Sequence, residues 1–178
     1  MLMKGGHNGE NHNHNDVGSF LLYLNGEPGI LDAGNVVYTA KTFSSERYTL
    51  WNTRSRNHNV ALIAGCEQGA GAEFRAVDVI MDEESASMEL KHCYPVECGL
   101  KSYVRHAVLH QDGFRLHDRI SMVCPAPVEW VFLLREEPSI QPGVCNAGAL
   151  RLCFSPELQC EAEAYPVTDA RMKQKPIP

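Results

Sequence analysis

Residues 101–123 read KSYVRHAVLHQDGFRLHDRISMV, and this stretch decides the class of fold. After the turn Asp112-Gly113, apolar and polar side chains alternate over residues 114–122. A period of two beside an Asp-Gly turn is the strongest short-range signal for a β-hairpin. Asp118 breaks the apolar face, so we expect it to have a partner or to lie near a sheet edge.

The rest of the chain repeats this pattern at shorter length. An apolar run at residues 19–24 precedes the turn Asn25-Gly26, and residues 29–32 form the predicted returning strand. Sustained helical periodicity is absent, although Ser44-Ser45-Glu46-Arg47 is suited to open one helical turn. Short strands joined by turns indicate an all-β fold, an antiparallel sandwich or barrel. Further strands are predicted at residues 60–64, 73–81, 86–92, 128–134, 149–154 and 158–164.

The composition is that of a globular domain. The 178 residues are 44% hydrophobic and 21% charged, which suits one domain with its own core. No apolar run approaches the roughly 20 residues that span a bilayer, and the first residues contain no signal-peptide stretch. A net charge of −6 makes the chain a poor nucleic-acid binder. We therefore expect neither a membrane nor a nucleic acid as partner.

The cysteines indicate no disulfide framework. There are seven of them, none in a CxxC pair, and most lie in apolar runs where a free thiol behaves as a small core residue. Unpaired thiols weakly favour a reducing, cytoplasmic compartment, although the sequence leaves the localisation open.

The residues best suited to chemistry stand in residues 5–20, GGHNGENHNHNDVGSF. Three histidines, an aspartate and a glutamate occur in this segment, and Asp32 and His58 follow later. Imidazoles combined with a carboxylate are donors that zinc prefers. Residue types alone do not select the ligands, because His12 and His14 share one face in a regular strand but point apart in an irregular loop.

Three other interpretations remain open at this point. The segment can be a solvated loop whose polar side chains only cap turns. It can belong to a cupin-like metal protein, in which His-x-His opens a β-barrel, although Asp16 follows the pair closely and Glu27 lies beyond a turn. It can also belong to a zinc-stabilised, non-catalytic carbohydrate-binding or structural sandwich. Such modules usually bind through exposed aromatic platforms, and aromatic residues make up only 8% here.

The same segment resembles a known family. Residues 5–8, GGHN, and 12–20, HNHNDVGSF, resemble the heparinase II/III-like polysaccharide lyases, including oligoalginate lyases. Residues 25–34, 38–48 and 57–59 resemble the hairpin, the loop and the His-Asn step that follow in that family. From residue 60 to about 134 the resemblance consists of a strand pattern only, in which Arg105 and Asp118 stand at positions that resemble those of the family.

The resemblance implies a domain organisation. In the family, an N-terminal α/α toroid supplies a catalytic tyrosine, and a C-terminal β-sandwich supplies the segment matched here. The implied fold is an antiparallel β-sandwich of the two-sheet supersandwich type over residues 1–164. The three prolines and three basic residues at 165–178 predict a flexible tail. A toroid has no room in this chain, so we expect the isolated chain to be weakly active or inactive.

The resemblance also implies roles for individual residues. His14, Asp32 and His58 would be the ligands of a structural Zn²⁺, and His12 would be the catalytic histidine facing the substrate cleft.

The implied substrate contacts are a separate group. His7, Asn8 and Glu10 would lie beside the cleft, and Arg54 is a candidate to help neutralise the substrate carboxylate. The implied activity is β-elimination on uronic-acid-containing glycans, so the expected partners are an anionic uronate polysaccharide or oligosaccharide and a toroid domain. A face that normally packs on a toroid also makes a homo-oligomer an expected state.

Overall fold

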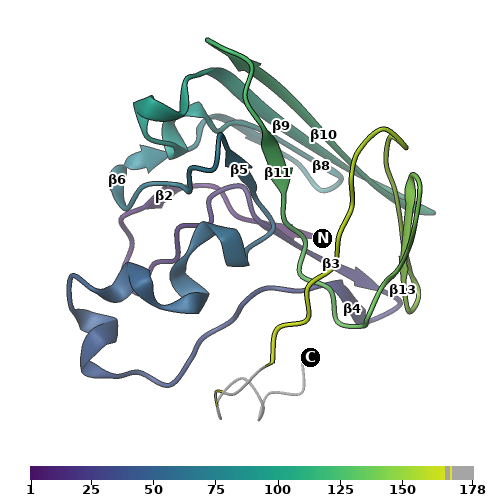
Figure 1. Ribbon diagram of the computed structural model, residues 1–178, viewed down its shortest axis with the longest axis horizontal. Helices are drawn as coiled ribbons and strands as arrows, with labels where there is room; N and C mark the ends of the chain where they lie inside the picture. Colours follow the sequence, from purple (N-terminus) through teal and green to yellow (C-terminus); the bar gives the residue numbers. More distant parts are fainter. Residues whose placement is uncertain (167–168, 170–178) are drawn as a thin grey trace.

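The computed structural model describes residues 1–166 and 169, and every pair of adjacent strands in it is antiparallel. The largest sheet has the strand order β10-β9-β8-β7. Figure 1 shows this sheet on one side of the molecule, whereas the blue segment of short helical turns lies on the other. The strands of this sheet are Val77–Met81 (β7), Ser85–Glu89 (β8), Leu100–His110 (β9) and Gly113–Met122 (β10).

Smaller sheets form the opposing layer and its borders. They have the orders β1-β3-β4, β11-β5, β12-β13-β14 and β2-β6. Their strands are Leu2–Met3 (β1), His7–Asn8 (β2), Phe20–Leu24 (β3), Glu27–Ile30 (β4), Ala61–Ile63 (β5), Gly71–Arg75 (β6), Val128–Trp130 (β11), Ser139–Gln141 (β12), Val144–Ala147 (β13) and Leu150–Cys153 (β14).

The core lies between these layers. One cluster joins Ile63 of β5 to Met88 and Tyr103 of the large sheet, and a second joins Phe20 of β3 to Phe114 of β10. Burial of such side chains is the main favourable term in folding. The all-β antiparallel sandwich predicted from the sequence is therefore confirmed.

The two predicted hairpins are both present. β9 and β10 pair along their whole length, with His110 opposite Gly113 at the turn. In β3-β4, Asn25 and Gly26 have φ of 52° and 84°, the positive values that a tight hairpin turn requires. Asp118 satisfies both expectations, because β10 is an edge strand and its carboxylate accepts a hydrogen bond from Trp130 at 2.8 Å.

Some predicted strands are wrong in extent. Residues 73–81 form two strands, because β6 pairs with β2 whereas β7 pairs with β8, and Asp78 has a φ of 51°. Residues 86–92 leave the sheet after Glu89, and residues 128–134 leave it after Trp130. Residues 158–164 form no strand, since most of their side chains are exposed and no neighbouring strand pairs with them.

The irregular region contains short 3₁₀ helices, as the helical turn predicted near residues 44–47 suggested. Within the described residues no helix exceeds four residues, and none is long and apolar enough to cross a membrane. Residues 167–168 and 170–178 of the predicted tail lie outside the described residues. The 3₁₀ helices are Ala40–Phe43 (η1), Arg47–Thr49 (η2), Trp51–Thr53 (η3), Ser55–Asn57 (η4), Lys91–Cys93 (η5) and Val96–Cys98 (η6).

Candidate functional site

An irregular loop between β2 and β3 sends two histidines in different directions. His12 has a φ of 59°, a left-handed conformation that no regular strand contains. Its side chain is exposed, whereas His14 is partly buried and turned toward His58. Of the two arrangements that the sequence left open, the structure therefore has the irregular loop.

His14, Asp32 and His58 come together from three separate segments. One ligand atom of each lies within 4.8 Å of the others. His58 Nδ1 is 3.1 Å from Asp32 Oδ2, and the imidazole rings of His14 and His58 have centroids 5.1 Å apart. His58 is fully buried, whereas Asp32 keeps one exposed side. This arrangement can hold one cation.

Asn52 in η3 contacts both histidines. Its carbonyl oxygen lies 2.9 Å from His58 Nε2. A carbonyl can only accept a hydrogen bond, so His58 Nε2 carries a proton and Nδ1 is the nitrogen that faces Asp32. The Asn52 amide nitrogen lies 3.2 Å from His14 Nε2. Histidine ligands of metals usually donate one ring N–H to a carbonyl or carboxylate, which orients the other nitrogen toward the metal.

The electrostatics of the three residues agree with a cation site. Burial, together with the neighbouring His58, lowers the pKa of His14 to about 4, so its imidazole is neutral at neutral pH. Burial opposes ionisation of Asp32, but the hydrogen bond and charge of His58 outweigh it and lower the pKa to about 2. Burial also opposes protonation of His58, yet the carboxylates of Asp32 and Asp16 raise its pKa. Protonated His58 can donate through Nδ1 to Asp32, and a metal ion bound by both groups would replace that proton.

Basic residues fix the loop from both sides. Lys4 forms an ion pair with Asp16 and also donates to the carbonyl of His14 at 3.2 Å. Arg47 donates through Nε to the carbonyl of Asn13 at 3.0 Å. Asp16 is thus neutralised by Lys4, and its Oδ2 remains 3.9 Å from His58 Nδ1.

The residues expected beside a substrate cleft are dispersed. His7 and Glu10 reach the surface, and the His7 ring accepts a hydrogen bond from the Gly9 amide at 3.1 Å. Asn8 is fully buried, and its amide donates to Gln68 at 3.0 Å. Arg54 is ion-paired with Glu67. In this structure Asn8 has no surface to offer a substrate, and the charge of Arg54 is already matched.

His12 belongs to an exposed aromatic group. Its ring stacks on Tyr38, with centroids 5.3 Å apart and planes at 15°. Phe43 meets the His12 ring edge-on at 6.0 Å and is itself 68% exposed. An imidazole held by two aromatic rings keeps a defined direction, and the His12 side chain remains exposed.

The sequence did not single out Asn52 or Gln68. Gln68 is buried, and its amide group holds both the N–H and the carbonyl of Val17, at 3.0 and 2.7 Å. Both are common residue types in unremarkable positions, so no local pattern identifies them. The one sequence signal that could have identified Asn52 is its position in the polar segment that precedes His58.

Comparisons with known proteins agree with this fold. The sequence profile of the heparinase II/III-like C-terminal domain matches residues 1–165. A solved structure titled heparinase III superposes with a TM-score of 0.60 at 17% identity, covering 80% of this chain and 22% of the other. No match was found among curated proteins. The fold is therefore that of an all-β domain, similar to part of the solved heparinase III chain. The chain belongs to the heparinase II/III-like C-terminal domain family.

Proposed function

We propose that this chain is the β domain of a lyase that cleaves uronic-acid-containing glycans by β-elimination, and that it works together with a second domain. The observation that carries the proposal is the position of His12. His12, whose ring is exposed, is two residues from the partly buried His14, which closes the cluster with Asp32 and His58.

Zinc is the cation that we propose for the cluster. The donor set consists of the neutral imidazole of His14, the ionised carboxylate of Asp32 and the imidazole of His58. The Nε2 atom of His58 faces the carbonyl of Asn52. Bound there, the ion would supply a structural cross-link between the loop and the sheets. His14 would fix the loop, whereas Asp32 and His58 would fix the two sheet segments.

His12 is the residue that we propose to meet the substrate. In β-elimination, the proton at C5 of the uronate is removed and the C4–O bond breaks, which leaves a C4=C5 double bond in the new end sugar. The C5 proton becomes acidic only when the adjacent carboxylate is neutralised. An imidazole at His12 can donate to that carboxylate or transfer a proton, and a positioned acid or base contributes about 10²–10⁴-fold in rate.

The surface around His12 supports a second domain as partner. Val37, Tyr38 and Phe43 are 50%, 40% and 68% exposed, and the latter two contact the His12 ring. Grouped apolar side chains at a surface indicate an interface. The chain spans 22% of the solved heparinase III chain, which leaves length in a protein of that kind for a further domain. We propose that this domain covers the aromatic group and supplies the remaining catalytic residues.

The first test is metal analysis of the purified chain with two matched variants. We expect one zinc per chain, loss of zinc in His14→Ala and retention in His12→Ala, because only His14 belongs to the cluster. Full zinc occupancy in both variants would contradict the ligand assignment. Iron or manganese at full occupancy would instead favour the cupin-like alternative.

The second test measures lyase activity on uronate polymers by the ultraviolet absorbance of the unsaturated product. The whole protein, including the second domain, is compared with its His12→Ala variant. We expect a loss of about 10²-fold or more in kcat with zinc content unchanged. Unchanged kcat in His12→Ala would refute the role of His12 and favour a non-catalytic carbohydrate-binding or structural domain.

A further inference from the structure

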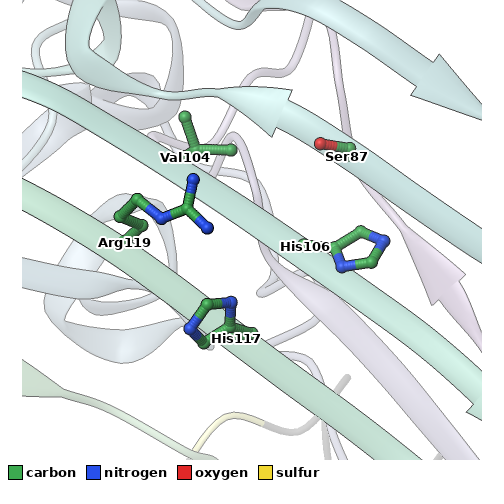
Figure 2. Close-up of a pocket in the computed structure, with 5 residues that line it drawn as sticks. All are labelled: Ser87, Val104, His106, His117 and Arg119. Carbon is green, nitrogen blue, oxygen red and sulfur yellow. The ribbon is translucent and has the colours of Figure 1, made fainter.

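The outer face of the large sheet has a hollow of about 280 Å³. Figure 2 shows side chains of β8, β9 and β10 around it. Side chains alternate between the two faces of a strand, and Tyr103, Arg105 and Ala107 are buried inside the sandwich. The hollow therefore opens on the face turned away from the core. It is lined by Ser87, Val104, His106, His117 and Arg119.

The strand register places these side chains in two adjacent rows. Ser87 pairs with His106, and His106 pairs with His117, so a hydroxyl and two imidazoles lie side by side across three strands. The next row pairs Val104 with Arg119. Directly paired residues have Cβ atoms about 4.5–5.5 Å apart, close enough for one small group to contact several of them. In Figure 2 the Arg119 guanidinium extends across β9 toward Val104.

The polar groups of the hollow have free hydrogen-bonding capacity. Over residues 1–166 and 169, the side chains of His106, His117 and Arg119 form no hydrogen bond or ion pair. Glu89 also lies on this face, where it is opposite Val104. One of its oxygens already accepts the backbone amides of Lys91 and Tyr103. Arg119 therefore supplies the formal positive charge of the lining, and Glu89 lies in the same row beyond Val104.

The position separates this hollow from the His14–Asp32–His58 cluster. Arg105 lies on the opposite face of β9 and donates to the carbonyls of Gly18 and Asn59, both at 2.9 Å. Asn59 adjoins His58 in the sequence, so the cluster and the hollow lie on opposite sides of the sheet. A ligand bound in the hollow does not contact His12 or the cluster.

We propose that this hollow is a second, non-catalytic binding site for the carboxylate or sulfate of an acidic saccharide. A guanidinium binds such oxyanions through two parallel hydrogen bonds, and the imidazoles and the Ser87 hydroxyl offer further donors. Val104 presents apolar surface to the C–H face of a sugar ring. The charge of Arg119 disfavours a metal ion between the histidines, and the lining contains no aromatic platform for a neutral sugar. The choice of a saccharide as carrier of the anion rests on the proposed function.

The test is titration of the whole chain with three probes, followed by NMR or calorimetry. The probes are a uronic acid tetrasaccharide, the neutral maltotetraose and inorganic sulfate. We expect the uronate tetrasaccharide to bind and maltotetraose not to bind. Arg119→Gln should weaken binding about tenfold or more, because a charge-assisted bidentate contact is lost. Arg151→Gln is the matched control, since it removes the same charge from an exposed position on β14.

The outcomes separate this site from the proposed lyase site. We expect His14→Ala and His12→Ala to bind the tetrasaccharide at the hollow as the wild type does, whatever their zinc content or lyase activity. His117→Ala should weaken binding in the same direction as Arg119→Gln. Equal binding by Arg119→Gln and Arg151→Gln would overturn the proposal. Binding of inorganic sulfate without binding of the tetrasaccharide would overturn the saccharide assignment.

Discussion

Arg105 and Asp118 form a buried, bidentate ion pair inside the sandwich. Arg105 Nε and Nη2 donate to the two oxygens of Asp118 at 2.9 and 2.7 Å, and the two side chains are 1% and 5% exposed. Arg105 Nη1 donates to the carbonyls of Gly18 and Asn59. The pair thereby joins the large sheet to the two segments that carry His14 and His58.

Removing one partner of this pair is expected to be costly. In Asp118→Ala the Arg105 guanidinium remains buried without its counter-charge, and such a loss costs about 3–5 kcal/mol of unfolding free energy. Glu27→Ala serves as control, because the Glu27–Arg135 pair is 74% and 48% exposed and such pairs contribute about 0–1 kcal/mol. Urea unfolding of both variants measures the difference. Equal losses would show that burial of the Arg105 pair is irrelevant to stability.

The same pair predicts a pH dependence. Burial opposes ionisation of Asp118, but the charge and hydrogen bonds of Arg105 outweigh it and lower the pKa below its ordinary 3.8. A lowered pKa stabilises the fold above the unfolded-state value, and this contribution is lost as the pH falls through the folded-state pKa. We expect the gap in unfolding free energy between wild type and Asp118→Ala to be constant above about pH 5 and to shrink below pH 3.8. A gap that widens on acidification would reverse the sign and contradict the assignment.

The sequence predicts the hairpins because their signals are local. Turn dipeptides and a period of two lie within some twenty residues, and positive φ at Asn25 and Gly26 follows from residue type. The two-residue strands β1 and β2 have no such signal, because pairing with distant strands creates them. The division of residues 73–81 likewise depends on a change of partner strand.

The candidate site could likewise be predicted only in part from the sequence. Resemblance to a family placed His14, Asp32 and His58 together, and the structure brings their ligand atoms within 4.8 Å. Neither the buried position of Asn8 nor the role of Gln68 follows from the sequence. Gln68 contacts Val17 across 51 residues of chain, and only the folded structure defines that contact.

Gln68 is predicted to hold the loop before β3. Its Oε1 accepts the amides of Val17 and Asn8, and its Nε2 donates to the Val17 carbonyl. Gln68→Ala leaves these buried groups unpaired, at about 1–3 kcal/mol for each unsatisfied group. We expect a clear fall in the urea midpoint, whereas Gln111→Ala at an exposed turn should change it little. Similar midpoints for the two variants would refute the role of Gln68.

Removal of the proposed zinc is expected to destabilise the wild type and His12→Ala but not His14→Ala. A ligand that binds only the native state stabilises it by RT ln(1 + [L]/Kd), about 2.7 kcal/mol when the free ligand is at 100 times Kd. We therefore expect a chelator to lower the melting temperature of the wild type and of His12→Ala. His14→Ala should melt at one temperature with or without chelator. A chelator effect that persists in His14→Ala would place the metal elsewhere in the chain.

Gly18 is predicted to lose more stability on gaining a side chain than a glycine at an open turn, because it combines strain with close packing. Its φ is +87°, and a Cβ there would lie 2.7 Å from Leu90 Cδ1. Gly26 is the matched control, since its φ is +84° and a Cβ there meets nothing within 4 Å. Both alanine variants carry the strain of a left-handed residue, about 1–2 kcal/mol, but only Gly18→Ala also displaces a buried leucine. We expect Gly18→Ala to lose at least about 1 kcal/mol more than Gly26→Ala in urea unfolding.

Adding Leu90→Ala to each variant completes the test, because Gly18→Ala should then couple to Leu90→Ala whereas Gly26→Ala should be additive with it. Additivity at both glycines would show that Leu90 does not restrict Gly18.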